Sequence, residues 1–316
     1  MDLVVKVEKL PKLGETILGE TLYENPGGKG ANQAVAAAKL GGNVSMIGKL
    51  GKDNYGEQLL LNLKSNNIKT EGIIRCDDIT GTAVIEVDSK GNNSIVVIPG
   101  SNLKLLKEDL DSASDLIDKA DIVILQQEIP METVEYALEL AAEKGKITIL
   151  NPAPAVKISE KVLAATDFLI LNETELEIIS GKESIPETEY IYTINELRNK
   201  GAKNIILTLG EKGGMYTEGE EIKEYKALKV TAVDTTAAGD SFIGAFALKL
   251  AENAGVSDAL EFAVGVSALT VTRSGAQQSL PTQEELKLFL ESKSSRCRPC
   301  STKTYETLVC SINTII

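Results

Sequence analysis

Residues 121–154, DIVILQQEIPMETVEYALELAAEKGKITILNPAP, contain the pattern that decides the fold. The short apolar run at residues 121–125 predicts a buried strand, and the amphipathic stretch at residues 131–143 predicts a helix that Gly145 stops. Residues 147–150 are a second apolar run, followed by a loop with two prolines. A strand, a helix and a strand in this order are typical of parallel strands joined by a crossover helix.

The same alternation continues towards the C-terminus. Further strands are predicted at residues 168–171 and 204–209, and further helices at 173–180, 191–200, 239–252 and 257–272. Strands that are apolar throughout indicate a sheet covered on both faces. We therefore predict a doubly wound, mainly parallel α/β sheet flanked by helices.

The first hundred residues have a different pattern. Three stretches with alternating apolar and polar residues predict half-exposed antiparallel strands at 16–23, 82–87 and 93–98, and residues 31–40 predict an early helix. We interpret the strands as a small antiparallel β-lid, from about 14–24 and 80–100, inserted into one domain spanning 1–292. The Ser/Thr/Cys-rich tail, 293–316, has no helical period, so we expect it to be disordered.

Composition excludes several classes of function. The 316 residues carry 33 Lys and Arg against 46 Asp and Glu, and this net charge of −13 argues against nucleic acid or an anionic membrane as a partner. No apolar run approaches the ~20 residues that span a bilayer, so we expect a cytoplasmic protein. The chain has no histidine, so proton transfer must come from other side chains. Cys297 and Cys300 have metal-ligand spacing, but no second pair accompanies them.

A glycine-rich loop precedes the early helix. Residues 25–32, NPGGKGAN, offer exposed backbone amides, one cation and one amide side chain. Such a loop suits recognition of hydroxyl or phosphate groups, although its spacing is not that of a phosphate-binding P-loop. The alternative is an ordinary glycine turn that opens a helix.

A second loop of small residues precedes a late helix. In residues 234–242, DTTAAGDSF, the amides near Gly239 would lie at the positive end of the helix, where they can hold a phosphoryl group. Asp240, in the first turn, could take a proton from a substrate hydroxyl. The alternative is that Asp240 only caps the helix.

Two further motifs follow predicted strands. Asn172 and Glu175 stand three residues apart at a junction of strand and helix, where a carboxylate can hold Mg²⁺ through water molecules. Glu175 could equally be a capping residue. Residues 208–213, TLGEKG, predict a strand followed by a glycine turn, which leaves room for a flat nucleotide.

This ordered set of motifs resembles the ribokinase-like carbohydrate and nucleoside kinases. The resemblance extends from Asp2 to about residue 290, and GGKGANQA at 27–34 is closer to the ribokinase branch than to fructokinases or adenosine kinases. It implies ATP-dependent phosphorylation of D-ribose at the 5-hydroxyl, in ribose catabolism. The alternatives are a kinase for deoxyribose, another pentose or a nucleoside, and a catalytically impaired sugar-binding homologue.

The resemblance also implies roles for individual residues. Asp240 would be the general base, beside an anion hole formed by Ala237, Ala238 and Gly239. The sugar would contact Asp2, Gly28, Lys29, Gly30, Asn32, Glu128 and Asp240. ATP would contact Asn172, Glu175, Thr208, Leu209, Gly210, Glu211, Lys212, Gly213, Gly239 and Val264.

Two cations and a partner are implied in the same way. Mg²⁺ would accompany ATP and be held by Glu175 through water. A monovalent cation such as K⁺ would be an activator, bound largely by main-chain oxygens of Asp234, Thr236, Thr270, Arg273, Gly275 and Ser279. The lid commonly forms a homodimer in this family.

The sequence departs from the family pattern in two places. Relatives have an apolar strand and an Asn-x-Asp motif at the position of Asp2, but here the strand and its Asn are missing. We therefore expect a central gap that exposes a sheet edge. Val264 stands where the family usually has Asn or His near the adenine, which predicts an apolar contact there.

Overall fold

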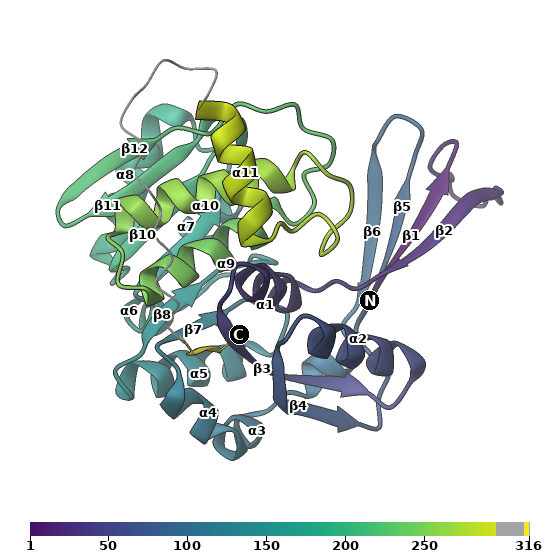
Figure 1. Cartoon of the computed structure of the whole chain (residues 1–316), viewed down its shortest axis with the longest axis horizontal. Helices are drawn as coiled ribbons and strands as arrows, with labels where there is room; N and C mark the ends of the chain where they lie inside the picture. Colours follow the sequence, from purple (N-terminus) through teal and green to yellow (C-terminus); the bar gives the residue numbers. More distant parts are fainter. Residues whose placement is uncertain (295–312, 316) are drawn as a thin grey trace.

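A nine-stranded sheet forms the centre of the protein in the computed structural model, which describes residues 1–294 and 313–315 (Figure 1). Its order is β12-β11-β10-β9-β8-β7-β13-β3-β4, and only the β10–β11 and β11–β12 pairs are antiparallel. The strands are β3 (Asn43–Gly51), β4 (Lys69–Cys76), β7 (Ile122–Leu125), β8 (Ile147–Leu150), β9 (Phe168–Asn172), β10 (Asn204–Thr208), β11 (Gly214–Glu218), β12 (Glu221–Tyr225) and β13 (Asn313–Ile315).

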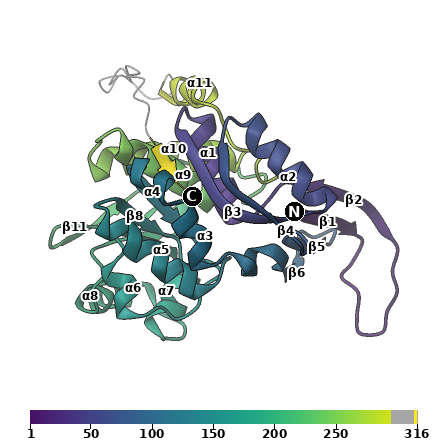
Figure 2. The ribbon, with the colours of Figure 1, turned by 90° about the horizontal axis from the view of Figure 1, so that it is seen from below.

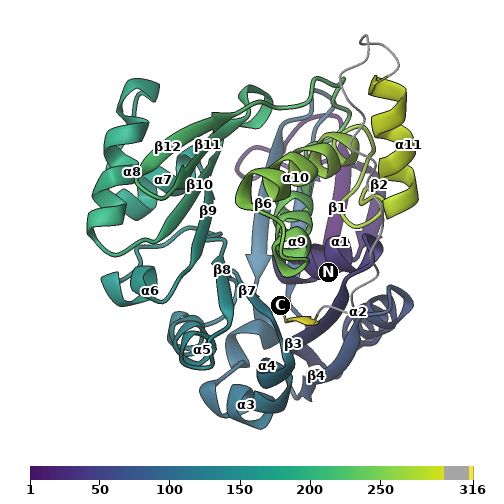
Figure 3. The same ribbon diagram turned by 60° about the vertical axis from the view of Figure 1, so that its left-hand side comes forward.

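Helices cover both faces of this sheet (Figure 3). In β7, Ile122 and Ile124 pack into one hydrophobic core, with α1, α9, α10 and α11, whereas Val123 and Leu125 pack into a second, with α3 to α8. The helices are α1 (Lys29–Lys39), α2 (Asn54–Ser65), α3 (Lys107–Ser112), α4 (Ser114–Lys119), α5 (Met131–Glu143), α6 (Glu160–Ala164), α7 (Glu173–Ser180), α8 (Tyr190–Asn199), α9 (Ala238–Ala251), α10 (Val256–Thr270) and α11 (Gln283–Ser294), with short 3₁₀ turns at Gly100–Lys104, Glu187–Glu189 and Gly210–Lys212.

A separate four-stranded sheet forms the lid and projects from the main body (Figure 2). Its order is β2 (Gly19–Asn25), β1 (Asp2–Val7), β5 (Thr82–Val87) and β6 (Asn93–Ile98). The predicted lid lacked β1, which lies inside this sheet and pairs with β5 in parallel. The lid is therefore mixed rather than purely antiparallel, because β1 runs parallel to β5 and antiparallel to β2.

The predicted disordered tail contains a strand. β13 lies between β7 and β3 and is parallel to both, with Thr314 opposite Val44 and Ile122. The prediction of an exposed sheet edge is therefore wrong along the paired residues, because the backbone of β13 supplies hydrogen bonds to β3 and β7. Helix α11 also continues two residues into the predicted tail. Residues 295–312 and 316, with Cys297, Cys300 and Cys310, lie outside the described residues.

The region between the first helix and the lid hairpin also contains elements that the periodicity did not predict. These are β3, α2 and β4, which together cover most of residues 43–76. The helices α3, α4 and α6 and the strands β11 and β12 were not predicted either. The strands and helices that were predicted are observed, with ends that shift by up to three residues. None of the helices within 1–294 is long and apolar enough to cross a membrane.

Candidate active site

The loop before α1 holds the carboxylate of Asp2. A Cβ atom at Gly27 would lie 2.0 Å from Oδ2 of Asp2, so only glycine permits this approach. Gly28 has a φ of +97°, and the amide of Lys29 donates a hydrogen bond of 2.8 Å to Glu128 Oε2. The structure thus brings together residues from β1, the start of α1 and the loop after β7.

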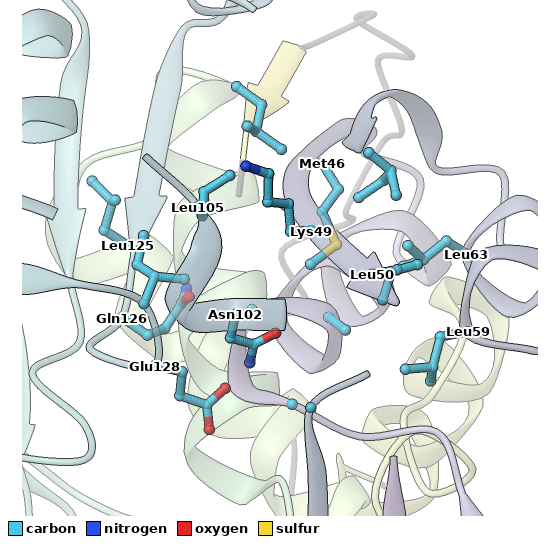
Figure 4. Close-up of a pocket in the computed structure, with 18 of the residues that line it drawn as sticks. Met46, Lys49, Leu50, Leu59, Leu63, Asn102, Leu105, Leu125, Gln126 and Glu128 are labelled. Carbon is cyan, nitrogen blue, oxygen red and sulfur yellow. The ribbon is translucent and has the colours of Figure 1, made fainter. Parts of the chain in front are cut away.

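A cavity of about 160 Å³, here called the β3–β7 cavity, opens beside this loop. Its polar side includes Gly28, Gly30, Gln126 and Glu128, and Gln277 also lines it. In Figure 4, Glu128 and Gln126 lie opposite the leucines of β3 and α2. The cavity therefore combines hydroxyl-binding groups with an apolar wall.

A second cavity of about 220 Å³, here called the α9 cavity, opens at the start of α9. Its lining brings together predicted residues from α1, β9, α7, β10 and the start of α9: Lys29, Asn172, Glu175, Thr208, Ala237, Ala238, Gly239 and Asp240. Asn151, which no motif singled out, also lines it. Lys29 belongs to this cavity, whereas its neighbours Gly28 and Gly30 line the β3–β7 cavity, so the two cavities meet at this loop.

The first turn of α9 presents backbone amides to its cavity. Ala237 precedes the helix in the left-handed conformation, with a φ of +59°. The amide of Ala238 donates to Thr235 O at 3.2 Å, so it is not free, whereas the amides of Ala237 and Gly239 donate to none of the described residues. Gly239 is exposed and lines the α9 cavity. Two of the three predicted anion-hole amides are therefore available.

Asp240 is 8% exposed and receives two amide hydrogen bonds. Asn32 Nδ2 donates to Oδ2 at 2.9 Å, and Gln33 Nε2 donates to Oδ1 at 3.0 Å. Burial raises the pKa of Asp240, although Lys29 and these two bonds oppose the shift. A carboxylate with raised proton affinity at the end of a cavity is suited to accept a proton near neutral pH.

Asn172 and Glu175 form a reciprocal capping box at the start of α7. Asn172 Oδ1 accepts from the Glu175 amide, and Glu175 Oε2 accepts from the Asn172 amide, both at 2.9 Å. Both residues also line the α9 cavity, and burial raises the pKa of Glu175. The capping interpretation of Glu175 is therefore correct, and its carboxylate still faces the cavity.

The other predicted nucleotide contacts are less concentrated. Thr208 lines the α9 cavity. Leu209 and Gly213 flank the 3₁₀ turn Gly210–Lys212, and residues 209–213 line neither cavity. Val264 lies half-buried on α10, packed against the core. Lys212 forms an ion pair with Glu187 at the surface.

The predicted monovalent-cation residues meet where two loops adjoin. Asp234 accepts hydrogen bonds from Thr236 and, at 2.9 Å, from the Gly275 amide. Partial burial acts to raise the pKa of Asp234, but these hydrogen bonds outweigh it and the pKa is lowered. The Thr270 carbonyl accepts from the Arg273 amide. In the other five predicted cation residues, the main-chain oxygen accepts no hydrogen bond from any of the described residues; these are Asp234, Thr236, Arg273, Gly275 and Ser279.

The charges around the two cavities are unbalanced. Burial raises the pKa of Asp2 and of Glu128, as it does for Asp240 and Glu175, and Lys29 is the cation that acts on three of these four carboxyl groups. The described residues contain no group of three acids or cysteines placed to hold a metal directly. This arrangement suits an anionic substrate that arrives with its own cation.

Comparison with known proteins agrees with this geometry. The family model described as "pfkB family carbohydrate kinase" matches residues 1–283. A deoxyribokinase from Salmonella typhi is 38% identical over 293 residues, covering 92% of this chain and 95% of its own. A ribokinase structure from Thermotoga maritima has a TM-score of 0.84 and 40% identity, covering 92% of this chain and 96% of its own. Arabidopsis thaliana ribokinase, complexed with ribose and ATP, has a TM-score of 0.83 and 30% identity, covering 92% of this chain and 95% of its own.

These matches confirm the predicted resemblance and the α/β fold. The chain belongs to the pfkB family of carbohydrate kinases, among its ribokinase- and deoxyribokinase-like members.

Proposed function

We propose that this protein transfers the γ-phosphoryl group of ATP to the 5-hydroxyl of D-ribose. The observation that carries the proposal is the position of Asp240 between two groups of residues. Asn32 links it to the glycine loop, which lies against Asp2 and lines the β3–β7 cavity together with Glu128. Asp240 itself lines the α9 cavity with Gly239, whose amide donates to none of the described residues. Sugar and phosphate would thus approach one carboxylate from opposite sides.

The proposed reaction is an in-line displacement. The 5-hydroxyl oxygen forms a bond to the γ-phosphorus, the bond from phosphorus to the leaving oxygen of ADP breaks, and Asp240 accepts the hydroxyl proton. The amides of Ala237 and Gly239 would donate to the phosphoryl oxygens at the positive end of α9. Lys29, at the junction of the cavities, would neutralise part of the transferring charge.

Two cations fit residues of this chain. Glu175 presents a single carboxylate to the α9 cavity, which suits Mg²⁺ held through water, and the ion would neutralise phosphate charge when bound. The unpaired carbonyl oxygens around Asp234 and Gly275 suit a monovalent cation such as K⁺. It would fix the loop that precedes α9.

The candidate sugars are ribose and deoxyribose. One similar protein is a deoxyribokinase and two are ribokinases, so deoxyribose is the second candidate. The test is ATP consumption with ribose, deoxyribose and fructose, each with and without K⁺. A higher kcat/KM for ribose supports the proposal, a higher value for deoxyribose replaces it, and no consumption with any sugar favours a binding protein without kinase activity.

We propose further that two lids pair in a homodimer. Apolar side chains on the outer strands of the lid are exposed: Leu22, Tyr23, Ile95, Val96, Val97 and Ile98. Exposed apolar side chains concentrated on one small sheet are typical of an interaction surface. Sedimentation should show a dimer that Val96→Glu dissociates, whereas Leu61→Glu, at an equally exposed site on α2, should not. A monomeric parent protein would refute the proposal.

A further inference from the structure

We propose that Gln33 and Gln277, which no motif assigns a role, are positioning residues that hold the carboxylate of Asp240 through two chains of buried amides. This inference rests on the proposed function, because it concerns the group that would act as general base. Gln33 and Gln277 are 0% and 5% exposed.

The first chain reaches Asp240 through Gln33. Gln126 Nε2 donates to Gln33 Oε1 at 2.5 Å, and Gln33 Nε2 donates to Asp240 Oδ1 at 3.0 Å. Because its oxygen is already bound, the Gln33 amide cannot turn over without losing one bond and placing its oxygen against the carboxylate. Its direction of donation is therefore fixed.

The second chain reaches the other oxygen through Asn32. Asn62 Nδ2 donates to Gln277 Oε1 at 2.6 Å, Gln277 Nε2 donates to Asn32 Oδ1 at 3.1 Å, and Asn32 Nδ2 donates to Asp240 Oδ2 at 2.9 Å. Gln277 thus fixes the Asn32 amide in the orientation that donates to Asp240.

The segment that carries Gln277 is itself held in place. The half-buried Lys39 side chain donates from its ammonium group to the main-chain oxygens of Gln277 and Leu280, at 3.0 and 2.9 Å. Asp234 accepts from the amide of Gly275 in the same segment. A shift of this segment would therefore be transmitted through Gln277 and Asn32 to Asp240.

The two chains act on both the orientation and the proton affinity of Asp240. Hydrogen bonds to a carboxylate favour its ionised form, so each lost donor raises the pKa of the acid. The charged groups that act with it are Lys29 on α1, Asp2 on β1, Glu128 after β7 and Glu175 on α7. Burial is what raises the pKa of Asp240, so the two amide donors, together with Lys29, offset the cost of burying its charge.

The test compares Gln33→Met and Gln277→Met with Gln278→Met. Gln278 is an exposed neighbour whose amide bonds to Asn25, so its variant controls for local disturbance of the loop. For Gln33→Met, kcat should fall about tenfold or more, and the acid limb of its pH profile should move up by about one unit, as expected for one lost hydrogen bond to a charged group. Gln277→Met should move the limb in the same direction by less, and Gln278→Met should not move it. Folded Gln33→Met and Gln277→Met proteins with an unmoved acid limb would overturn the inference.

A second measurement needs no turnover. In the parent protein, the loss of melting temperature caused by Gln33→Met should grow between pH 5 and pH 8, because the lost donor matters more to the ionised carboxylate. In an Asp240→Asn background the loss should be the same at both pH values. A loss that is independent of pH in both backgrounds would overturn the network. A protein that phosphorylates no sugar would instead overturn the proposed function, and this measurement would still decide the inference.

Discussion

Replacing Asp240 by asparagine should separate catalysis from stability. The amide has the shape of the carboxylate but cannot accept the substrate proton. Loss of a general base costs about 10²–10⁴ in rate, so kcat should fall by that factor while KM for both substrates changes little. The assay is steady-state ADP formation at saturating ATP and ribose. A variant that kept more than half of kcat would refute the assignment of Asp240.

The same substitution should raise the melting temperature. One of the two amide donors, Asn32 or Gln33, would face the new NH₂ group and lose its acceptor, at a cost of about 1 kcal/mol. Against this, the variant no longer buries a charge, whose desolvation costs several kcal/mol in a protein interior, by order of magnitude. The balance favours the variant, and each kcal/mol corresponds to roughly 2–4 °C in a chain of this size.

The sign of the pH dependence follows from the raised pKa. Burial raises the pKa of Asp240, so the folded protein binds this proton more tightly than the unfolded chain. Stability therefore falls as pH rises from the ordinary carboxyl range through the folded-state pKa. The advantage of Asp240→Asn should be largest at pH 8 and disappear near pH 4. Asp115→Asn, at an exposed site on α4, should change neither kcat nor melting temperature at any pH. An Asp240→Asn protein that melts below its parent at pH 8 would refute this reasoning.

Three other perturbations test separate parts of the structure. Replacing K⁺ by Na⁺ or choline should lower kcat without lowering the melting temperature. Equal rates in the three salts would refute the proposed activation by a monovalent cation. Gly27→Ala should raise KM for the sugar more than tenfold, because the new Cβ would lie 2.0 Å from Asp2 Oδ2, whereas Gly255→Ala, with nothing within 4 Å, should not. Deleting residues 295–316 should lower the melting temperature by about 5 °C or more, since buried groups on β3 and β7 lose partners that are each worth about 1–3 kcal/mol. An unchanged melting temperature would show that β13 adds no stability.

Local pattern predicted the crossover units because each of their strands is apolar on both faces. In these units, the helix Met131–Glu143 and the strand Ile147–Leu150 have the predicted ends. In the lid, where apolar and polar residues alternate, the strands Thr82–Val87 and Asn93–Ile98 also have the predicted ends. In contrast, β3 includes Lys49, which donates to Lys104 O, and two glycines, so its period was obscured. Pattern reports which residues are buried, but not which neighbour buries them.

The candidate site was predicted where the chain concentrates chemistry in short motifs. Asp240, Glu175 and Lys29, which belong to three of the motifs, line one cavity, and the glycines beside Lys29 line the other. Gln277 and Asn151 were missed because an isolated amide has no sequence signal. The role of such an amide depends on which carboxylate or amide the fold places beside it. That neighbour can lie more than one hundred positions away in the sequence, as Asn32 does from Gln277 and Gln33 does from Asn151.

The gap between β3 and β7 shows most clearly why sequence pattern was insufficient. Among the described residues, β13 pairs with the first part of each neighbour, up to Ser45 and Val123. The next residues, from Met46 on β3 and from Ile124 on β7, line the β3–β7 cavity (Figure 4). One gap in the sheet therefore contains a strand at one end and a cavity at the other. The cavity lies at the carboxyl ends of parallel strands, where α/β proteins bind ligands. Pairing along the full length of β3 and β7 would fill the apolar part of this cavity, whereas the pairing with Asn313–Ile315 leaves that space open beside the proposed sugar contacts.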